Sequence, residues 1–138
     1  SIFRSIEQYN LTPYLNHIPF LSHKDALKEL QSSQVLLLPI NDTPNSLGVI
    51  PGKIYEYLGA RRPIIGIGPL NGDSAQILND SGAGTMFAYE SHSEIGSQIE
   101  NYFDDFSKGQ LESKTGQIMQ YSRKAMAKSY AELLEDLT

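Results

Sequence analysis

The sequence predicts an α/β domain of the Rossmann-like, three-layer type with a mostly parallel sheet. Two runs that are apolar throughout, residues 35–38 and 64–67, have the pattern of parallel strands buried on both faces. Stretches with helical periodicity separate these runs, which is the order of elements in βαβ units. A length of 138 residues suits one domain with a single core, so we treat residues 1–138 as one unit.

The elements follow one another along the chain with short connections. Strands are predicted at Tyr14–Phe20, where interspersed polar residues indicate a position near the sheet edge, and at 35–38, 64–67 and 84–88. Helices are predicted over 1–10, 22–32, from Pro51 to just before Pro63, and over 73–80, 91–106 and 111–137. Apolar side chains expected to face the core from these helices are Ile2, Phe3, Ile6, Tyr9, Ala26, Leu27, Leu30, Ile54, Leu58, Ile95, Ile99, Tyr102, Phe103, Phe106, Met119, Met126, Tyr130, Leu133 and Leu137.

The chain opens in a helical pattern at Ser1, whereas a doubly wound domain begins with a strand. We therefore expect the first strand of the domain to precede Ser1, and the sequence to be part of a longer chain.

The helix that starts at Pro51 lacks a side-chain cap. Three other helix starts have cap spacing, at Ser22 with Asp25, Asp73 with Gln76, and Ser91 with Glu94. Ile50 precedes Pro51 and offers no acceptor, so the amides of Gly52, Lys53 and Ile54 are predicted to meet water or an anion. The helix dipole favours negative charge there, and a phosphate is the natural anion. A water-capped helix beside a mobile loop is the alternative.

Lys53 and Glu56 lie three residues apart on this helix. They form either a surface ion pair worth ~0.2–0.5 kcal/mol or a pair of ligand contacts, with the ammonium on phosphate and the carboxylate on a ribose diol. The preceding loop, Ile40–Ile50, is long enough to be functional. Its Asp42, Asn45 and Ser46 suit either turns or bonds to a sugar.

A resemblance to a known family favours the ligand contacts. Pro51, Lys53, Glu56 and Tyr57, followed by Arg62-Pro63-Ile64, resemble the donor-binding segment of the large retaining family of GT-B-fold glycosyltransferases. The resemblance extends to residues 20–27, 33–39, 73–78 and 81–84, and nearly all of residues 11–137 can be placed on it.

The resemblance implies a donor site for a nucleotide-diphosphate sugar. Glu56 would hold the ribose, Lys53 and the backbone of the preceding segment would hold the diphosphate, and the chain after the Tyr14–Phe20 strand would read the base. The site residues are then Glu56, Lys53, Ser46, Leu47, Gly48, Val49, Pro51, Gly52, Phe20 and Ser22. For Phe20 and Ser22, a core position and a simple helix cap are the alternatives.

What the resemblance implies for the whole protein is retaining glycosyl transfer without a metal or other cofactor, to a saccharide or lipid-linked acceptor bound through an N-terminal domain. No catalytic residue is expected within residues 1–138. In the resembled family the chief phosphate-binding Arg and Lys usually follow the first strand, which we expect upstream of Ser1, and acceptor contacts come from the N-terminal domain. We therefore expect weak nucleotide binding and no transfer by the chain alone. One departure concerns the sugar, because the family often has a glutamate where this chain has Gly48.

Composition excludes several classes of protein. The net charge is -5 and the basic residues are scattered, which argues against nucleic acid. There is no cysteine, and His17, His23 and His92 are isolated in sequence, so no metal site is predicted. We expect a cytoplasmic protein, with peripheral association of the full-length protein at the inner face of the membrane allowed by the resemblance.

Two other functions stay open at this point. A sugar-nucleotide epimerase of GT-B shape would use a similar ribose glutamate, with acid and base residues in both domains. A non-enzymatic α/β interaction module would leave the Pro51 helix capped by water.

Overall fold

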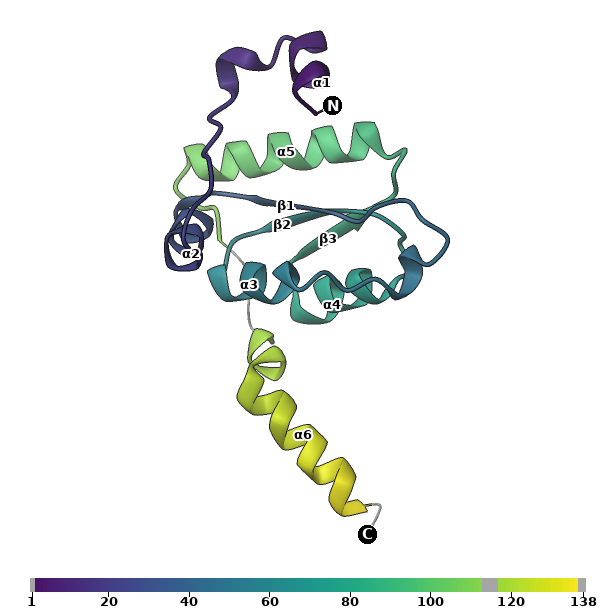
Figure 1. The fold of residues 1–138 in the computed structure, drawn as a ribbon. Helices are drawn as coiled ribbons and strands as arrows, with labels where there is room; N and C mark the ends of the chain where they lie inside the picture. The colour runs from purple at the N-terminus through teal and green to yellow at the C-terminus, as the bar shows by residue number, and fades with distance from the viewer. Residues whose placement is uncertain (1, 113–116, 137–138) are drawn as a thin grey trace.

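Three parallel strands form an open sheet in the computed structural model, which describes residues 2–112 and 117–136. The strands β1 (Leu36–Pro39), β2 (Ile64–Ile67) and β3 (Gly84–Phe87) lie side by side in chain order (Figure 1). Leu36 is in register with Ile64, which is in register with Gly84, so all three strands end at the same edge. The α/β class and the parallel sheet are confirmed.

Helices cover both faces of this sheet (Figure 1). The helices α3 (Lys53–Ala60) and α4 (Asp73–Ser81) lie on one face, and α5 (His92–Ser107) lies on the other. The helix α2 (His23–Ser32) packs beside α3. This order of a helix layer, a sheet and a second helix layer agrees with a Rossmann-like domain.

The core lies between the sheet and the layer formed by α3 and α4. Ile54 and Leu58 of α3 are almost fully buried, which confirms the inward face predicted for that helix. Leu38 of β1, Ile64 of β2 and Leu78 of α4 belong to the same buried cluster. These contacts fix where the first turn of α3 lies against the end of β1.

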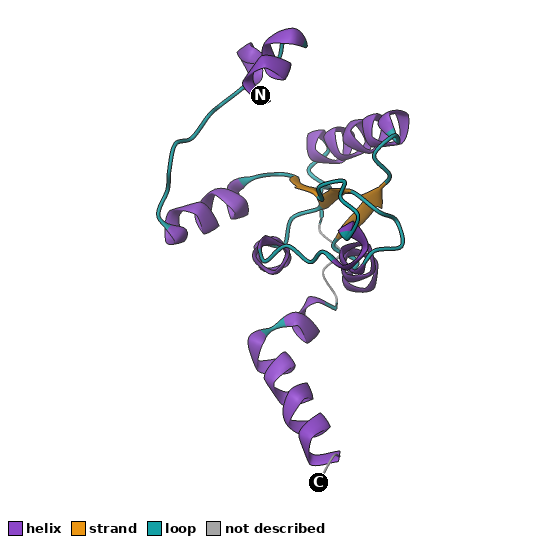
Figure 2. Ribbon diagram, turned by 45° about the vertical axis from the view of Figure 1, so that its right-hand side comes forward, coloured by secondary structure: helices purple, strands orange, loops and turns teal. Residues whose placement is uncertain are grey.

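The strand predicted at Tyr14–Phe20 is wrong. A short 3-10 turn, η1 (Thr12–Tyr14), begins this segment, and residues 15–22 have no regular structure. Figure 2 shows a long loop that leads from α1 to α2 without meeting the sheet. A strand needs a hydrogen-bonding partner, and within residues 2–112 and 117–136 no segment pairs with the outer edge of β1.

The N-terminal helix α1 (Ile2–Gln8) is also less buried than predicted. Ile2 and Tyr9 are exposed, and Phe3 makes an edge-to-face contact with His17 at 5.4 Å between ring centroids. Without an adjoining strand, this segment has no sheet face on which to bury its apolar side.

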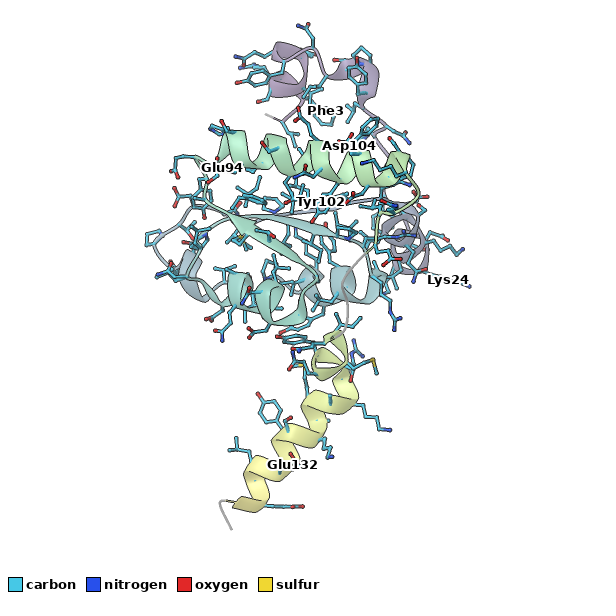
Figure 3. All side chains as sticks on the ribbon, turned by 180° about the vertical axis from the view of Figure 1, so that it is seen from behind. Phe3, Lys24, Glu94, Tyr102, Asp104 and Glu132 are labelled. Carbon is cyan, nitrogen blue, oxygen red and sulfur yellow. The ribbon has the colours of Figure 1, made fainter. Side chains whose placement is uncertain are left out.

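The predicted apolar face of α5 is only partly covered. Figure 3 shows Tyr102 between α5 and the sheet, and this side chain is half-buried. Phe103 and Phe106 remain exposed, and they line a shallow apolar hollow with Val35 and Ile65. The sheet ends at β1, so there is no further strand beneath this part of α5 in the described chain.

The helix predicted over 111–137 is interrupted. A 3-10 turn, η3 (Ile118–Tyr121), precedes α6 (Arg123–Asp136), while residues 113–116 and 137–138, including Leu137, lie outside the described part. Ile118 is buried and Tyr121 packs against the core. Beyond this contact α6 leads away from the domain (Figure 1), so the core positions predicted for Met119, Met126, Tyr130 and Leu133 are wrong.

Two adjacent leucines of β1 test this core. Leu38 is 0% exposed, so Leu38→Ala should lower the free energy of unfolding by ~2–5 kcal/mol through lost apolar contact and a cavity. Leu37, its neighbour, is 54% exposed, and Leu37→Ala should cost less than about 1.5 kcal/mol. Chemical denaturation measures both values, and equal losses would contradict the assigned faces of β1.

Candidate functional site

The candidate site lies at the edge of the sheet where the strands end. The chain leaves β1 at Pro39, runs through a loop that contains a 3-10 turn, η2 (Ser46–Gly48), and enters α3 at Lys53. In open α/β sheets this carboxyl edge is where ligands bind. The predicted residues Ser46, Leu47, Gly48, Val49, Pro51, Gly52 and Lys53 are therefore brought together as one continuous segment.

The loop before α3 is held by its own hydrogen bonds and by α4. The amide of Gly48 donates to the carbonyl of Asn45, and that of Val49 to the carbonyl of Ser46, each at 3.2 Å. The buried hydroxyl of Ser74 donates to the carbonyl of Val49 at 2.6 Å. These two amides are therefore bonded within the loop, and the contact of Gly48 and Val49 with a diphosphate stays a prediction.

The first turn of α3 leaves two amides open. The helix begins at Lys53, two residues later than predicted, and Gly52 takes the cap position with helical backbone angles. The amide of Ile54 donates to the carbonyl of Pro51 at 2.9 Å, so the prediction that this amide is open to water or an anion is wrong. The amides of Gly52 and Lys53 have no acceptor within the described residues, and both residues are exposed.

The comparison of helix caps also needs correction. Ser22 caps α2 as predicted, since its hydroxyl accepts from the amide of Asp25 at 3.2 Å and donates to the Asp25 carboxylate at 2.7 Å. Bonds from Ser22 and then Lys28 hold the pKa of Asp25 below its usual value. Gly72, however, takes the cap position of α4, and Ser91 makes no side-chain cap. An uncapped start is therefore shared by several helices and does not distinguish α3.

A hollow lies beside the start of α3, as another lies beside the start of α4, and the one at α3 is lined by a lysine. Lys53 lines a hollow of about 400 Å³ together with Pro39 and Ile40, which end β1, and with Asn41 and Thr43 from the following loop. A cation, a helix start and two polar loop residues thus surround one space at the carboxyl edge of the sheet.

Glu56 faces a different space from Lys53. No ion pair joins these two side chains in the described structure, so the surface-pair alternative fails. The Glu56 carboxylate oxygen Oε1 instead lies 3.7 Å from Nδ1 of His23, at the first residue of α2. Both side chains are exposed, at 43% for Glu56 and 72% for His23.

A second hollow of about 400 Å³ surrounds Glu56. Three segments form its walls: α2, α3 and the chain from η3 into α6, with lining residues His23, Leu27, Gln31, Tyr55, Glu56, Gly59, Ala60, Tyr121, Ser122 and Arg123. Residues along α3, from Tyr55 to Ala60, line this second hollow. Lys53 lines the first hollow and Glu56 lines the second.

The predicted base contacts lie near this second hollow. Ser22 directly precedes His23, and Phe20 is 98% exposed, so Phe20 is not a core residue. An exposed aromatic ring three residues before the first residue of α2 is available for stacking.

Sequence reasoning missed His23, Tyr121 and Arg123 as lining residues. In the sequence His23 is an isolated histidine, and its approach to Glu56 depends on how α2 packs against α3. The Arg62 guanidinium donates to the carbonyl of Gln31, in the last turn of α2.

Two further features concern chemistry and location. The described residues contain no group of three or more His, Asp or Glu side chains placed to hold a metal ion. None of the helices in the described ranges is long and apolar enough to cross a membrane.

Comparison with models of protein families, with curated proteins and with solved structures gives no match for this chain. The assignment of the site therefore depends on its own geometry and on the sequence resemblance.

The bond from Ser74 to the loop offers a test of how the loop is held. Ser74→Ala removes the donor to Val49 and should lower the free energy of unfolding by ~1–2 kcal/mol. Amide hydrogen exchange should rise in residues 46–52, because their anchor on α4 is lost. The matched control is Ser97→Ala on the exposed face of α5, which should change neither quantity; an equal effect of both variants would contradict this anchor.

Proposed function

We propose that this domain binds a nucleotide-diphosphate sugar across the start of α3. The observation that carries the proposal is that Lys53 and Glu56, three residues apart on α3, each line a hollow. One ligand with an anionic part and a ribose part matches both.

The diphosphate belongs on the side of Lys53. The open amides of Gly52 and Lys53 and the Lys53 ammonium give this place a local positive character, although the whole chain has a net charge of -5. Amides at a helix start and a lysine are the common protein partners of phosphate oxygens.

The ribose belongs on the side of Glu56. An ionised carboxylate accepts hydrogen bonds through two oxygens, and a ribose presents two neighbouring hydroxyl donors. Glu56 lies one helical turn beyond Lys53, about 4.5 Å along the axis. A single ligand can therefore reach both residues.

The reaction that follows from such a ligand is glycosyl transfer. The bond between the sugar C1 and the diphosphate oxygen breaks, C1 forms a bond to the oxygen of an acceptor hydroxyl, and the proton of that hydroxyl passes to the leaving diphosphate. The leaving diphosphate gains negative charge as this happens, and amides and a cation stabilise it without a divalent ion. In this proposal the full protein is a retaining glycosyltransferase whose saccharide or lipid-linked acceptor binds through another domain.

The main test is the loss of the ribose contact. Glu56→Ala should weaken binding of the nucleotide sugar by about 10- to 100-fold, because hydrogen bonds to a charged group are worth ~1.5–3 kcal/mol. Calorimetric titration with UDP-glucose, GDP-mannose and ADP-glucose measures this, using the probe that binds tightest to the unaltered chain.

Glu100→Ala, which removes an exposed carboxylate from α5, is the matched control and should leave the affinity unchanged. Failure of all three probes to bind, or equal affinity of Glu56→Ala and the unaltered chain, would overturn the proposal.

The diphosphate contact has a different signature. Lys53→Ala should weaken binding about fivefold at low ionic strength, and this difference should shrink as salt is added, because exposed charges are screened. Lys108→Ala, at the end of α5, should have no effect on affinity. A salt-independent loss in Lys53→Ala would point to a packing role and contradict the contact.

A further inference from the structure

We propose that His23 is a positioning residue that makes nucleotide-sugar binding dependent on pH. This inference rests on the proposed function, since it concerns the same Glu56 carboxylate. It follows from the 3.7 Å approach of His23 Nδ1 to Glu56 Oε1 between two different helices.

The two residues meet because of how α2 and α3 pack. His23 is the first residue of α2, where the Ser22 cap fixes the chain, and Glu56 lies in the first turn of α3, which Ile54 anchors in the core. The imidazole approaches one carboxylate oxygen, Oε1. The other oxygen, Oε2, has no partner within the described residues and stays available to a hydroxyl donor.

The imidazole of His23 is one of several polar groups that line this hollow. Tyr55, Tyr121 and Arg123 face it from α3 and from the η3–α6 segment, and Lys24 and Asp25 are its neighbours on α2. Burial, and then the nearby Asp80 and Tyr55, raise the pKa of Tyr121, while the pKa of Asp25 is lowered. Lysine and arginine stay charged between pH 6 and 8, whereas a histidine ordinarily changes charge in this range.

The direction of the effect follows from the charge of the ligand. With a neutral imidazole, the Glu56 carboxylate carries an uncompensated negative charge close to an anionic diphosphate. With an imidazolium, that charge is balanced and the carboxylate is held in place for the ribose. Both effects strengthen binding at low pH, so affinity should fall as pH rises through the range in which histidine loses its proton.

The expected size is modest because the pair is exposed. Exposed ion pairs are worth ~0.2–1 kcal/mol, which corresponds to an affinity about 1.4- to fivefold higher at pH 6 than at pH 8. The probe should be an intact nucleotide sugar, whose diphosphate is esterified at both ends and does not titrate between these pH values.

The experiment measures affinity for the tightest of UDP-glucose, GDP-mannose and ADP-glucose at pH 6, 7 and 8, with three variants of the 138-residue chain. His23→Gln cannot take up a proton and should bind at every pH as the unaltered chain does at pH 8. His23→Arg is charged throughout and should bind at every pH as the unaltered chain does at pH 6. His92→Gln, on α5 beyond the sheet, should keep the original pH dependence.

Two failures can be told apart. If Glu56→Ala weakens binding but His23→Gln keeps the pH dependence, or the unaltered chain shows none, the role of His23 is overturned and the proposed function stands. If no probe binds at any pH, or Glu56→Ala has no effect, both are overturned.

Discussion

The parallel pairing of β1 with β2 is the constraint on which the candidate site depends. This pairing places the ends of both strands at one edge, and the chain that leaves β1 must return along one face of the sheet to reach β2. The return is made by α3, whose Ile54 and Leu58 are buried against the strands. Because these two buried side chains fix the helix, Lys53 and Glu56 lie exposed at its start.

Competition for backbone hydrogen bonds then decides what this start can bind. The loop from Asn41 to Ile50 uses several of its donors internally, and the carbonyl of Val49 is taken by Ser74. The first turn of α3 closes on Pro51 and Gly52. Two amides, those of Gly52 and Lys53, have no acceptor within the described residues, and they lie beside the Lys53 side chain. An anion bound there would be held by few groups, and weak binding by this chain alone stays a prediction.

The sheet and the helices around it were readable from sequence because their signals are local. Apolar runs at 35–38 and 64–67 led directly to β1 and β2, and the spacing of Ile54 and Leu58 identified the inward face of α3. The strand predicted at Tyr14–Phe20 was wrong because a strand depends on a partner strand, and the residues of the segment do not reveal whether that partner is present. The burial predicted for the apolar faces of α1 and α6 was wrong for the same reason, since helical periodicity predicts an apolar side without predicting what covers it.

The sequence predicted the segment that forms the start of α3 but only part of its contacts, and the roles of its residues stay a prediction. Residue types located the Pro51–Glu56 segment, and the family resemblance supplied roles for Lys53 and Glu56. Cap spacing was less informative, because Asp73 became the first residue of α4 and left the cap position to Gly72. The approach of His23 to Glu56 joins residues that are distant in sequence, and it depends on the packing of α2 against α3. No sequence pattern encodes that distance.

The most direct test of the account is a map of where a nucleotide sugar touches the chain. Titration of the ¹⁵N-labelled protein with the tightest of the three nucleotide sugars, followed by amide NMR, reports the surroundings of each backbone N–H. We expect the largest shifts at Gly52 and Lys53, with a second group at the start of α2 around His23. Shifts confined to α5 or α6, or none at saturating ligand, would contradict the claim that the start of α3 is the donor site.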